Sequence, residues 1–487
     1  MINLIPSWSR GVFQSALAVL TPAALRDCLA KFQTSRSPVI WVRRWRPLLC
    51  SSKVLYVSIW GLLLVCAARA SEGDASTPGQ TLSGFLASPE LTDGWFGVRP
   101  ELQQHGLTLN SSLTQFFQGL VSGQGNHEVE YGGKLDLTFA IDGQKLGLWP
   151  GLSVNGYGGF RYGETTNSAG EPLVPSNTAL FLPTGKGDVF SLTSLTVTQS
   201  LSPNLAISAG RFDTVLLYNT LFTGGYGLDK FMNLAFTAPP IVGKTVPPVT
   251  LGASLLVLHE KKPVFTATIF NSVNTPTTTG FEKLGSNGWT ISLNANLPVK
   301  LCGLSGDYSV GGTYSTEQLT SLSQNPLIIL PNLLSVKAPP LQKLSGSWEV
   351  NFAVDQYLYQ KPENPKIGWG VFGYCAFSDA NPNPIGFFAL AGIGGTSPIP
   401  CRENDNFGIG YDYLSVSHDL KQTFQPFTRL PIIGPKFELG NEQGVEIFYN
   451  AALTGWMKVA ADLQIVQPGI ASAPTATIFG VRLKIDF

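Results

Sequence analysis

The chain has 487 residues, of which only 13% are charged, while 52 are glycine and 29 are phenylalanine. This composition is unusual for a soluble enzyme and typical of a sheet with one face in lipid. Residues 1–70 hold nine basic residues and one acid, so 23 basic and 31 acidic residues remain in residues 71–487. An acidic body without a basic stripe excludes nucleic acid as a partner.

Residues 1–70 are predicted to be an N-terminal extension followed by a secretory signal peptide. Basic residues precede the apolar run 54–67, and a small-x-small cleavage pattern ends at residue 70. The run is too short to span a bilayer as a helix. An uncleaved anchor and a lipoprotein site at Cys66 are alternatives, the second disfavoured by the bulky residue before that cysteine. We therefore expect an exported protein in which residues 71–104 form a periplasmic lead-in.

Three cysteines follow the signal, namely Cys302, Cys375 and Cys401. An odd number in an exported protein leaves at least one thiol unpaired. Spacing leaves open whether Cys375 and Cys401 form a disulfide. The cysteines and histidines of the sequence show no metal-ligand spacing, so we expect neither a metal nor another cofactor.

From residue 107 onward, apolar and polar residues alternate over segments of about 8–12 residues. In residues 130–142, for example, Leu135 and Leu137 share one face, and Lys134 and Asp136 share the other. Such alternation predicts half-exposed strands. The predicted strands lie at 107–117, 130–142, 151–162, 189–201, 205–213, 250–258, 264–271, 288–297, 306–315, 345–358, 366–377, 385–394, 405–415, 443–453, 457–466 and 476–487.

Strand length, charge and number together favour a membrane barrel over a soluble sandwich. Tilted strands of about 9–11 residues cross a bilayer, whereas sandwich strands are usually about 5–6 residues long. The polar faces carry charges that a sandwich core would bury at high cost. Lipid also excludes an open sheet edge. We predict an all-β fold, a closed antiparallel transmembrane barrel of about 16 strands at residues 105–487, with a short helical lead-in.

Connections of alternating length support this arrangement. Short connections are predicted at 202–204 and 259–263. Long ones are predicted at about 163–187, 214–249, 316–344 and 378–384. A loop folded into the barrel is expected to narrow it, and the sequence does not identify which one.

Several motifs resemble those of the OprB-type carbohydrate-selective porins, in order along most of residues 85–487. They are Leu91–Leu102 (LTDGWFGVRPEL) with Gly106, Leu146–Gly151 (LGLWPG), Ala209–Asp213 (AGRFD), Phe407–Tyr411 (FGIGY), Glu446–Asn450 (EIFYN) and Ala461–Gly469 (ADLQIVQPG). Each motif is weak alone, and the ordered series is more specific. The resemblance implies passive diffusion of mono- or oligosaccharides through a barrel in the Gram-negative outer membrane.

Alternation also predicts which side chains line the lumen and meet a sugar. Arginine offers a fork of donors, carboxylates accept from hydroxyls, and aromatic rings stack on sugar C–H faces. Alternation leaves Arg211 and Asp213 ambiguous, and Gly210 is a candidate bulge that would turn Arg211 inward. Each candidate could instead be a solvated charge paired with a neighbour. The candidates are Tyr157, Arg161, Arg211, Asp213, Glu349, Asp355, Asp412, Glu446, Asp462 and Arg482, with Lys458 on the same face.

Other readings remain open at this point. A porin for general or other solutes would share the fold. A barrel hydrolase would need a catalytic cluster, and Asp379, Asp405 and His418 are available without a marked spacing. A soluble exported lectin or glycoside hydrolase is the third alternative. For a porin, the expected partners are carbohydrates, outer-membrane lipids and the barrel-assembly machinery acting on the strand that ends at Phe487. The sequence leaves open whether several copies of the chain associate.

Overall fold

The computed structural model describes residues 82–92, 94–95, 97–326, 328–329, 339–429 and 434–487. The predicted extension and signal peptide at residues 1–70 lie outside these residues. None of the described helices is long and apolar enough to cross a membrane.

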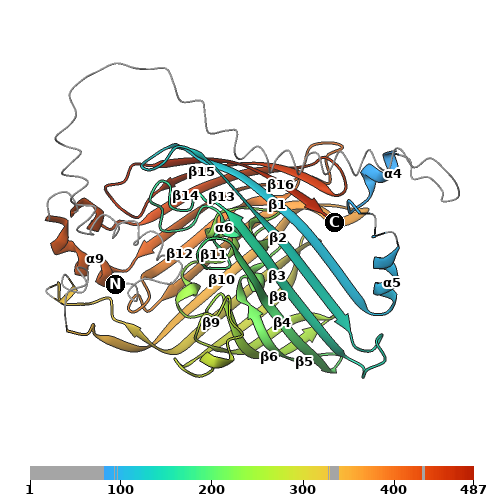
Figure 1. Ribbon diagram of the computed structural model, residues 1–487, viewed down its shortest axis with the longest axis horizontal. Helices are drawn as coiled ribbons and strands as arrows, with labels where there is room; N and C mark the ends of the chain where they lie inside the picture. The colour runs from blue at the N-terminus through green and yellow to red at the C-terminus, as the bar shows by residue number, and fades with distance from the viewer. Residues whose placement is uncertain (1–81, 93, 96, 327, 330–338, 430–433) are drawn as a thin grey trace, which may run out of the picture. The chain divides into compact units, whose positions relative to one another are not determined.

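Sixteen antiparallel strands form one closed barrel in the described part of the chain, as predicted (Figure 1). Each strand pairs with its neighbours in sequence, and β1 closes the barrel by pairing with β16. The strands are β1 Leu107–Ser122, β2 Val129–Asp142, β3 Leu152–Gly163, β4 Val189–Ser202, β5 Leu205–Asp213, β6 Val249–His259, β7 Lys262–Asn271, β8 Trp289–Leu301, β9 Leu304–Thr320, β10 Lys343–Lys361, β11 Asn364–Ser378, β12 Ile385–Thr396, β13 Asn406–Val416, β14 Glu442–Ala452, β15 Met457–Gln467 and β16 Ala476–Asp486.

Short helices precede the barrel and occupy its connections. They are α4 Leu82–Ala87, α5 Val98–Gln104, α6 Thr178–Phe181, η1 Thr214–Tyr218, η2 Gly225–Gly227, α7 Leu234–Thr237, η3 Val242–Lys244, η4 Phe281–Lys283, α9 His418–Phe424, η5 Gln425–Arg429 and η6 Gly434–Phe437. Helix α5 confirms the helical lead-in. Its buried Arg99 donates hydrogen bonds to the carbonyl oxygens of Leu109 (2.8 Å) and Phe487 (2.9 Å), which ties the lead-in to the first and last strands.

The wall follows the predicted alternation. In β10, Trp348 and Phe352 are 43% and 49% exposed on the outer face, whereas Glu349 and Asn351 are buried on the lumen face. Lipid can accept the apolar face, and a polar interior can accept the charges.

The two ends of the barrel differ in the length of their connections. At one end, which we call the turn end, β1 begins and β16 ends, and the connections are short: 143–151, 203–204, 260–261, 302–303, 362–363, 397–405 and 453–456. At the other, the loop end, long connections occur at 164–188, 214–248, 272–288, 321–342 and 417–441. The prediction was wrong for 378–384, because only residues 379–384 join β11 to β12, in a short connection.

The connection 214–248, which we call the inner loop, packs against the inside of the barrel wall. Its rings Phe231 and Phe236 stack with centroids 4.5 Å apart, and Phe231 also contacts Phe372 of β11 and Phe448 of β14. The lumen therefore contains an apolar cluster, which joins the inner loop to strands between β3 and β14.

The structure leaves Cys302, Cys375 and Cys401 unpaired. Cys375 lies near the loop end of β11, whereas Cys401 lies in a connection at the turn end. The disulfide that spacing left open is therefore absent among the described residues.

Candidate functional site: the lumen and its inner loop

Two arginines of the lumen wall, on strands β3 and β16, bind loop backbone. Arg161 of β3 donates to the carbonyl oxygens of Pro183 (3.4 Å) and Gly185 (3.3 Å) in the 164–188 loop. Arg482 of β16 donates to the carbonyl oxygens of Gly227 (2.6 Å) and Lys230 (2.7 Å) in the inner loop. Both side chains were predicted to line the lumen, and both are buried beneath loops there.

The carboxylates of the lumen accept backbone N–H groups of the inner loop. Glu446 accepts from Met232 and, at 3.0 Å, from Asn233. Asp355 of β10 accepts from the N–H of Leu221 at 2.9 Å. Hydrogen bonds to a charged group are stronger than neutral ones, so these carboxylates fix the loop at two points.

Asp213 and Tyr157 also serve the inner loop. Asp213 accepts from the N–H of Val215 (3.2 Å) and from the hydroxyl of Tyr226 (2.6 Å). Tyr157 donates to Asp136 and accepts from the ammonium of Lys134 at 2.7 Å. The Lys134 ammonium lies 3.6 Å from the centre of the Tyr226 ring, a cation–π contact between the barrel wall and the inner loop.

Three other predicted residues sit in the lumen wall with fewer loop contacts. Glu349 accepts from the side chain of Asn351, and Asp462 accepts from that of Gln464. Asp412 is buried without a hydrogen-bond partner among the described residues.

Arg211 is held by a different loop. Its guanidinium donates to carbonyl oxygens of Thr275, Pro276 and Thr278 in the connection 272–288. No register shift occurs at Gly210, so the ladder keeps Arg211 opposite the outward-facing Leu195. The predicted bulge is therefore wrong.

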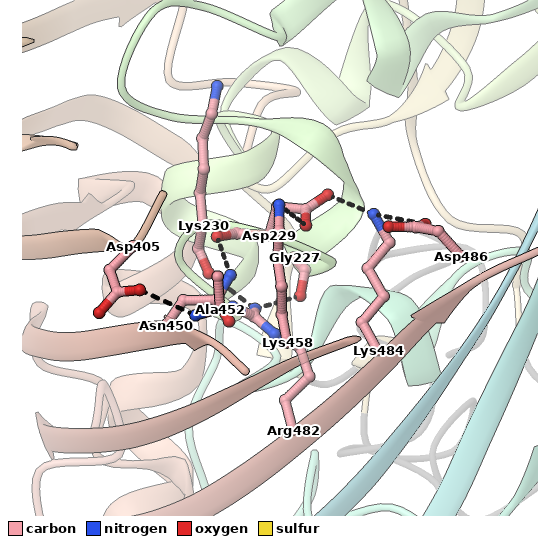
Figure 2. Close-up of polar contacts among 10 residues, drawn as sticks. All are labelled: Gly227, Asp229, Lys230, Asp405, Asn450, Ala452, Lys458, Arg482, Lys484 and Asp486. Atoms are coloured by element: carbon pink, nitrogen blue, oxygen red, sulfur yellow. Dashed lines mark hydrogen bonds and ion pairs between the residues drawn. The ribbon is translucent and has the colours of Figure 1, made fainter. Parts of the chain in front are cut away.

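The tip of the inner loop reaches the turn end of β15 and β16 (Figure 2). The carboxylate of Asp229 lies 2.6 Å from the ammonium of Lys484 and 3.6 Å from that of Lys458, and its carbonyl oxygen accepts from Asn450. Burial raises the pKa of the Asp229 carboxyl, but Lys484 and Lys458 more than offset this and bring the pKa to about 2. The inner loop thus extends from the loop end to the neighbourhood of the turn end.

Lys230 follows Asp229 and forms hydrogen bonds to other residues of the inner loop. Its ammonium donates to the carbonyl oxygens of Thr220 (2.6 Å) and Thr223 (2.9 Å) and to the side chain of Asn219. Burial lowers the pKa of Lys230 to about 8, and the nearby Asp355 and Asp229 oppose this effect.

One further carboxylate was missed by sequence reasoning. Glu442, the first residue of β14, accepts from the N–H groups of Leu173 (2.5 Å), Val174 (2.8 Å) and Gly469 (3.0 Å). It holds the 164–188 loop as Glu446 holds the inner loop. The sequence offered one signal for Glu442: it lies four residues before Glu446 in the same strand, so the two share the lumen face.

A second missed feature is a row of small hydroxyl side chains on the lumen face. Neighbouring strands place these residues directly opposite one another, and we call them the hydroxyl row. The hydroxyl row comprises Ser153, Thr198, Ser208, Ser254, Thr268, Ser292 and Thr313. Each contributes one ordinary residue to its own strand, so only the register reveals the row.

The available acids and histidine do not form a catalytic cluster. Asp405 lies at the turn end, where it accepts from Tyr449 (2.6 Å) and the N–H of Ala452 (2.9 Å). Asp379 and His418 lie at the loop end. The described residues also contain no group of three metal-ligating side chains.

The apolar outer wall, charged lumen, closed strand ladder and infolded loop define an outer-membrane barrel of the porin class. Short turns mark the periplasmic end of such barrels and long loops the extracellular end, so the turn end is periplasmic.

The chain belongs to the family described as "Carbohydrate-selective porin, OprB family", which matches residues 126–487. It is thus an outer-membrane carbohydrate porin. The fold resembles the high-pH structure of Pseudomonas putida OprB, with a TM-score of 0.70 and 19% identity over 82% of this chain and 99% of that one. The low-pH structure gives a TM-score of 0.50 and 17% identity with the same coverage. No curated protein sequence matches the chain significantly.

Proposed function

We propose that sugars cross this porin along the hydroxyl row, while the lumen charges hold the loops that narrow the barrel. The observation that supports this path is the continuous pairing of seven hydroxyl residues over neighbouring strands, from Ser153 to Thr313. Asp142 precedes the row in the ladder and Glu349 follows it.

The row climbs along the barrel because strands in a barrel are tilted. Counted from the periplasmic end, Ser153 is the second residue of β3, Ser208 the fourth of β5, Thr268 the seventh of β7 and Thr313 the tenth of β9. Residues that face one another across the ladder thus form a ramp from the periplasmic side toward the extracellular side.

Hydroxyl side chains suit an uncharged, hydroxyl-rich solute. Each can both donate and accept, so a sugar that loses part of its water shell can exchange partners step by step. Ser254 and Thr268 already share a hydrogen bond of 2.7 Å, as do Thr198 and Ser208 at 2.9 Å. Such weak, repeated sites let a solute enter and leave.

The inner loop borders this path. Its Phe231 ring packs on β11 and β14, its Tyr226 ring packs on Tyr157 of β3, and its Thr245 accepts a hydrogen bond from Thr313 at the upper end of the hydroxyl row. The lumen candidates from Tyr157 to Arg482 then act mainly by positioning loops, and the neutral wall is left for the solute.

We also propose that the protein catalyses no covalent step, since its acids at the two ends are far apart and engaged in backbone contacts. Lipids are the proposed partners of the outer wall, and the barrel-assembly machinery that of the last strand, which leads to Phe487. Association of several copies stays a prediction.

The double substitution Thr198→Val with Thr268→Val tests the path, because valine keeps the shape and removes the hydroxyl. We expect sugar flux in liposomes to fall about two- to tenfold, the effect of one net hydrogen bond, with ion conductance retained. Thr477→Val is the matched control, since Thr477 shares the outer face of β16 with Phe479. Unchanged sugar flux in the double variant would place the path elsewhere.

A further inference from the structure

A group of charged side chains lies at the periplasmic end of the lumen, around the tip of the inner loop (Figure 2). Lys458 of β15 and Lys484 of β16 lie opposite one another in the strand ladder. Their ammonium groups are 3.6 Å and 2.6 Å from the carboxylate of Asp229. Arg482 holds the loop backbone on both sides of Asp229. We call Lys458, Lys484, Arg482 and Asp229 the tip cluster.

The wall side of the tip cluster offers more donors than Asp229 uses. Oδ2 of Asp229 accepts a hydrogen bond from Lys484, whereas Oδ1 accepts none, because the Lys458 ammonium at 3.6 Å is too far away. In the part of the chain that the structure describes, the Lys458 ammonium donates no hydrogen bond, and Nη2 of the buried Arg482 has no partner. Buried donors are usually paired, so an acceptor with more oxygens would suit this wall better than a carboxylate does.

The tip cluster is accessible from the periplasmic mouth of the barrel. The side chains of Asp229 and Lys458 are 35% and 25% exposed, and Lys458 is the second residue of β15, counted from the periplasmic end. Water therefore reaches both side chains, and a soluble ion can follow the same route. A lipid headgroup cannot, because lipids lie outside the barrel.

We propose that the tip cluster binds a soluble tetrahedral dianion, of the phosphate or sulfate type, in place of the Asp229 carboxylate. Such an anion has more oxygens and more charge than a carboxylate, so it can accept from Lys484 and Lys458 together and face Nη2 of Arg482. Hydrogen bonds between charged groups are the strong ones. Asp486 lies 3.4 Å from Lys484 and opposes the anion, which keeps binding reversible. Asp229 is thus an internal competitor for its own site.

The consequence is control of the inner loop from the periplasm. Once the Asp229 carboxylate is displaced, Arg482 and Asn450 are the wall residues that still hold the tip, through its backbone carbonyl oxygens. A bound dianion should therefore loosen the tip without passing through the pore. This effect goes beyond the sugar path and does not depend on it.

The test measures sulfate binding to the purified full-length porin by calorimetry, with the ionic strength held constant by chloride. Asp229→Asn keeps the shape and removes the competing charge, so it should bind sulfate about two- to fivefold more tightly than the wild type, the strength of a partly exposed ion pair. Lys458→Gln should bind sulfate about tenfold more weakly, the effect of one hydrogen bond to a charged group. Lys145→Gln is the matched control, because Lys145 is an exposed lysine of the periplasmic turn 143–151, and it should bind like the wild type.

Planar bilayers test the consequence for the loop. Sulfate added on the periplasmic side should increase the open-channel noise of the wild type, and Asp229→Asn should show that noise without sulfate. Equal sulfate affinities for the wild type and Asp229→Asn overturn the inference, because the anion then does not replace the carboxylate. An unchanged affinity in Lys458→Gln also overturns it, as does acetate binding as tightly as sulfate. These outcomes leave the sugar path untouched, since its test follows the flux of a neutral solute.

Discussion

Arg482 illustrates how a lumen charge acts in this barrel. Its guanidinium donates to two carbonyl oxygens at the tip of the inner loop, and it lies buried near Asp462 and Glu446. A free arginine in a pore would screen or attract passing solutes, whereas this one fixes a segment of backbone. Arg161 of β3 acts in the same way on another loop.

Replacing Arg482 with methionine should release the inner-loop tip. The substitution removes two charge-assisted hydrogen bonds and leaves buried acids without their cation, a change that typically costs about 3–5 kcal/mol. We expect a larger and noisier single-channel conductance, and cleavage near residue 230 by added protease.

Lys361→Met is the control for that change. Lys361 pairs with Glu403 at the periplasmic surface, where both side chains are half-buried, and such surface pairs contribute little. If Arg482→Met conducts like Lys361→Met and the wild type, the arginine does not hold the loop.

At the level of elements, the inner loop fits its wall through missing side chains. Gly408 and Gly410 of β13 face the lumen, and a Cβ at either position would overlap the rings of Phe231 and Phe236. The glycines therefore provide the space that the aromatic cluster needs. The position of the inner loop therefore depends on the glycines of β13 as much as on the residues of the loop.

Gly410→Ala should displace Phe236 and loosen the inner loop. Overpacking of this kind costs about 1–3 kcal/mol, so the heat-induced mobility shift on gels should occur at a lower temperature. Gly373→Ala in β11 is the comparison, because the nearest atom to its added Cβ is the Leu390 carbonyl oxygen at 3.8 Å. Equal transition temperatures for both variants would show that the inner loop does not need the space left by the missing side chain at Gly410.

The strands were the part of the fold that could be predicted from the sequence. Alternation identified all sixteen, because a wall between lipid and water imposes a period of two on every strand. It also placed residues such as Glu349 and Arg482 on the lumen face. The loop contacts of these residues were not predictable, since Arg482 and Gly227 are joined only by the closed fold.

The contacts of the inner loop could not be predicted either. Its length was predicted, but Phe231 and Phe236 carry no periodic signal, and their partners Phe372 and Phe448 lie far away in sequence. The hydroxyl row was not predicted, for a related reason. Ser254 and Thr268 are unremarkable in their strands and become a surface only when the register aligns them.

As a whole, the molecule combines a wall of strands with two inward loops pinned by buried charges. Glu442 and Arg161 hold the 164–188 loop, and Glu446, Asp355 and Arg482 hold the inner loop. Most charged side chains of the lumen therefore hold loops in place. The hydroxyl row that we propose as the sugar path is neutral, so we expect the porin to favour uncharged sugars over ions of similar size.

Solute-resolved permeability of the purified, reconstituted porin tests this claim most directly. Liposome swelling should be compared for glucose, a disaccharide and gluconate, which matches glucose in size and carries a charge. The neutral-wall account predicts that glucose enters fastest and gluconate markedly more slowly at equal concentration. Equal rates for glucose and gluconate would contradict it and describe a pore that sorts solutes by size alone.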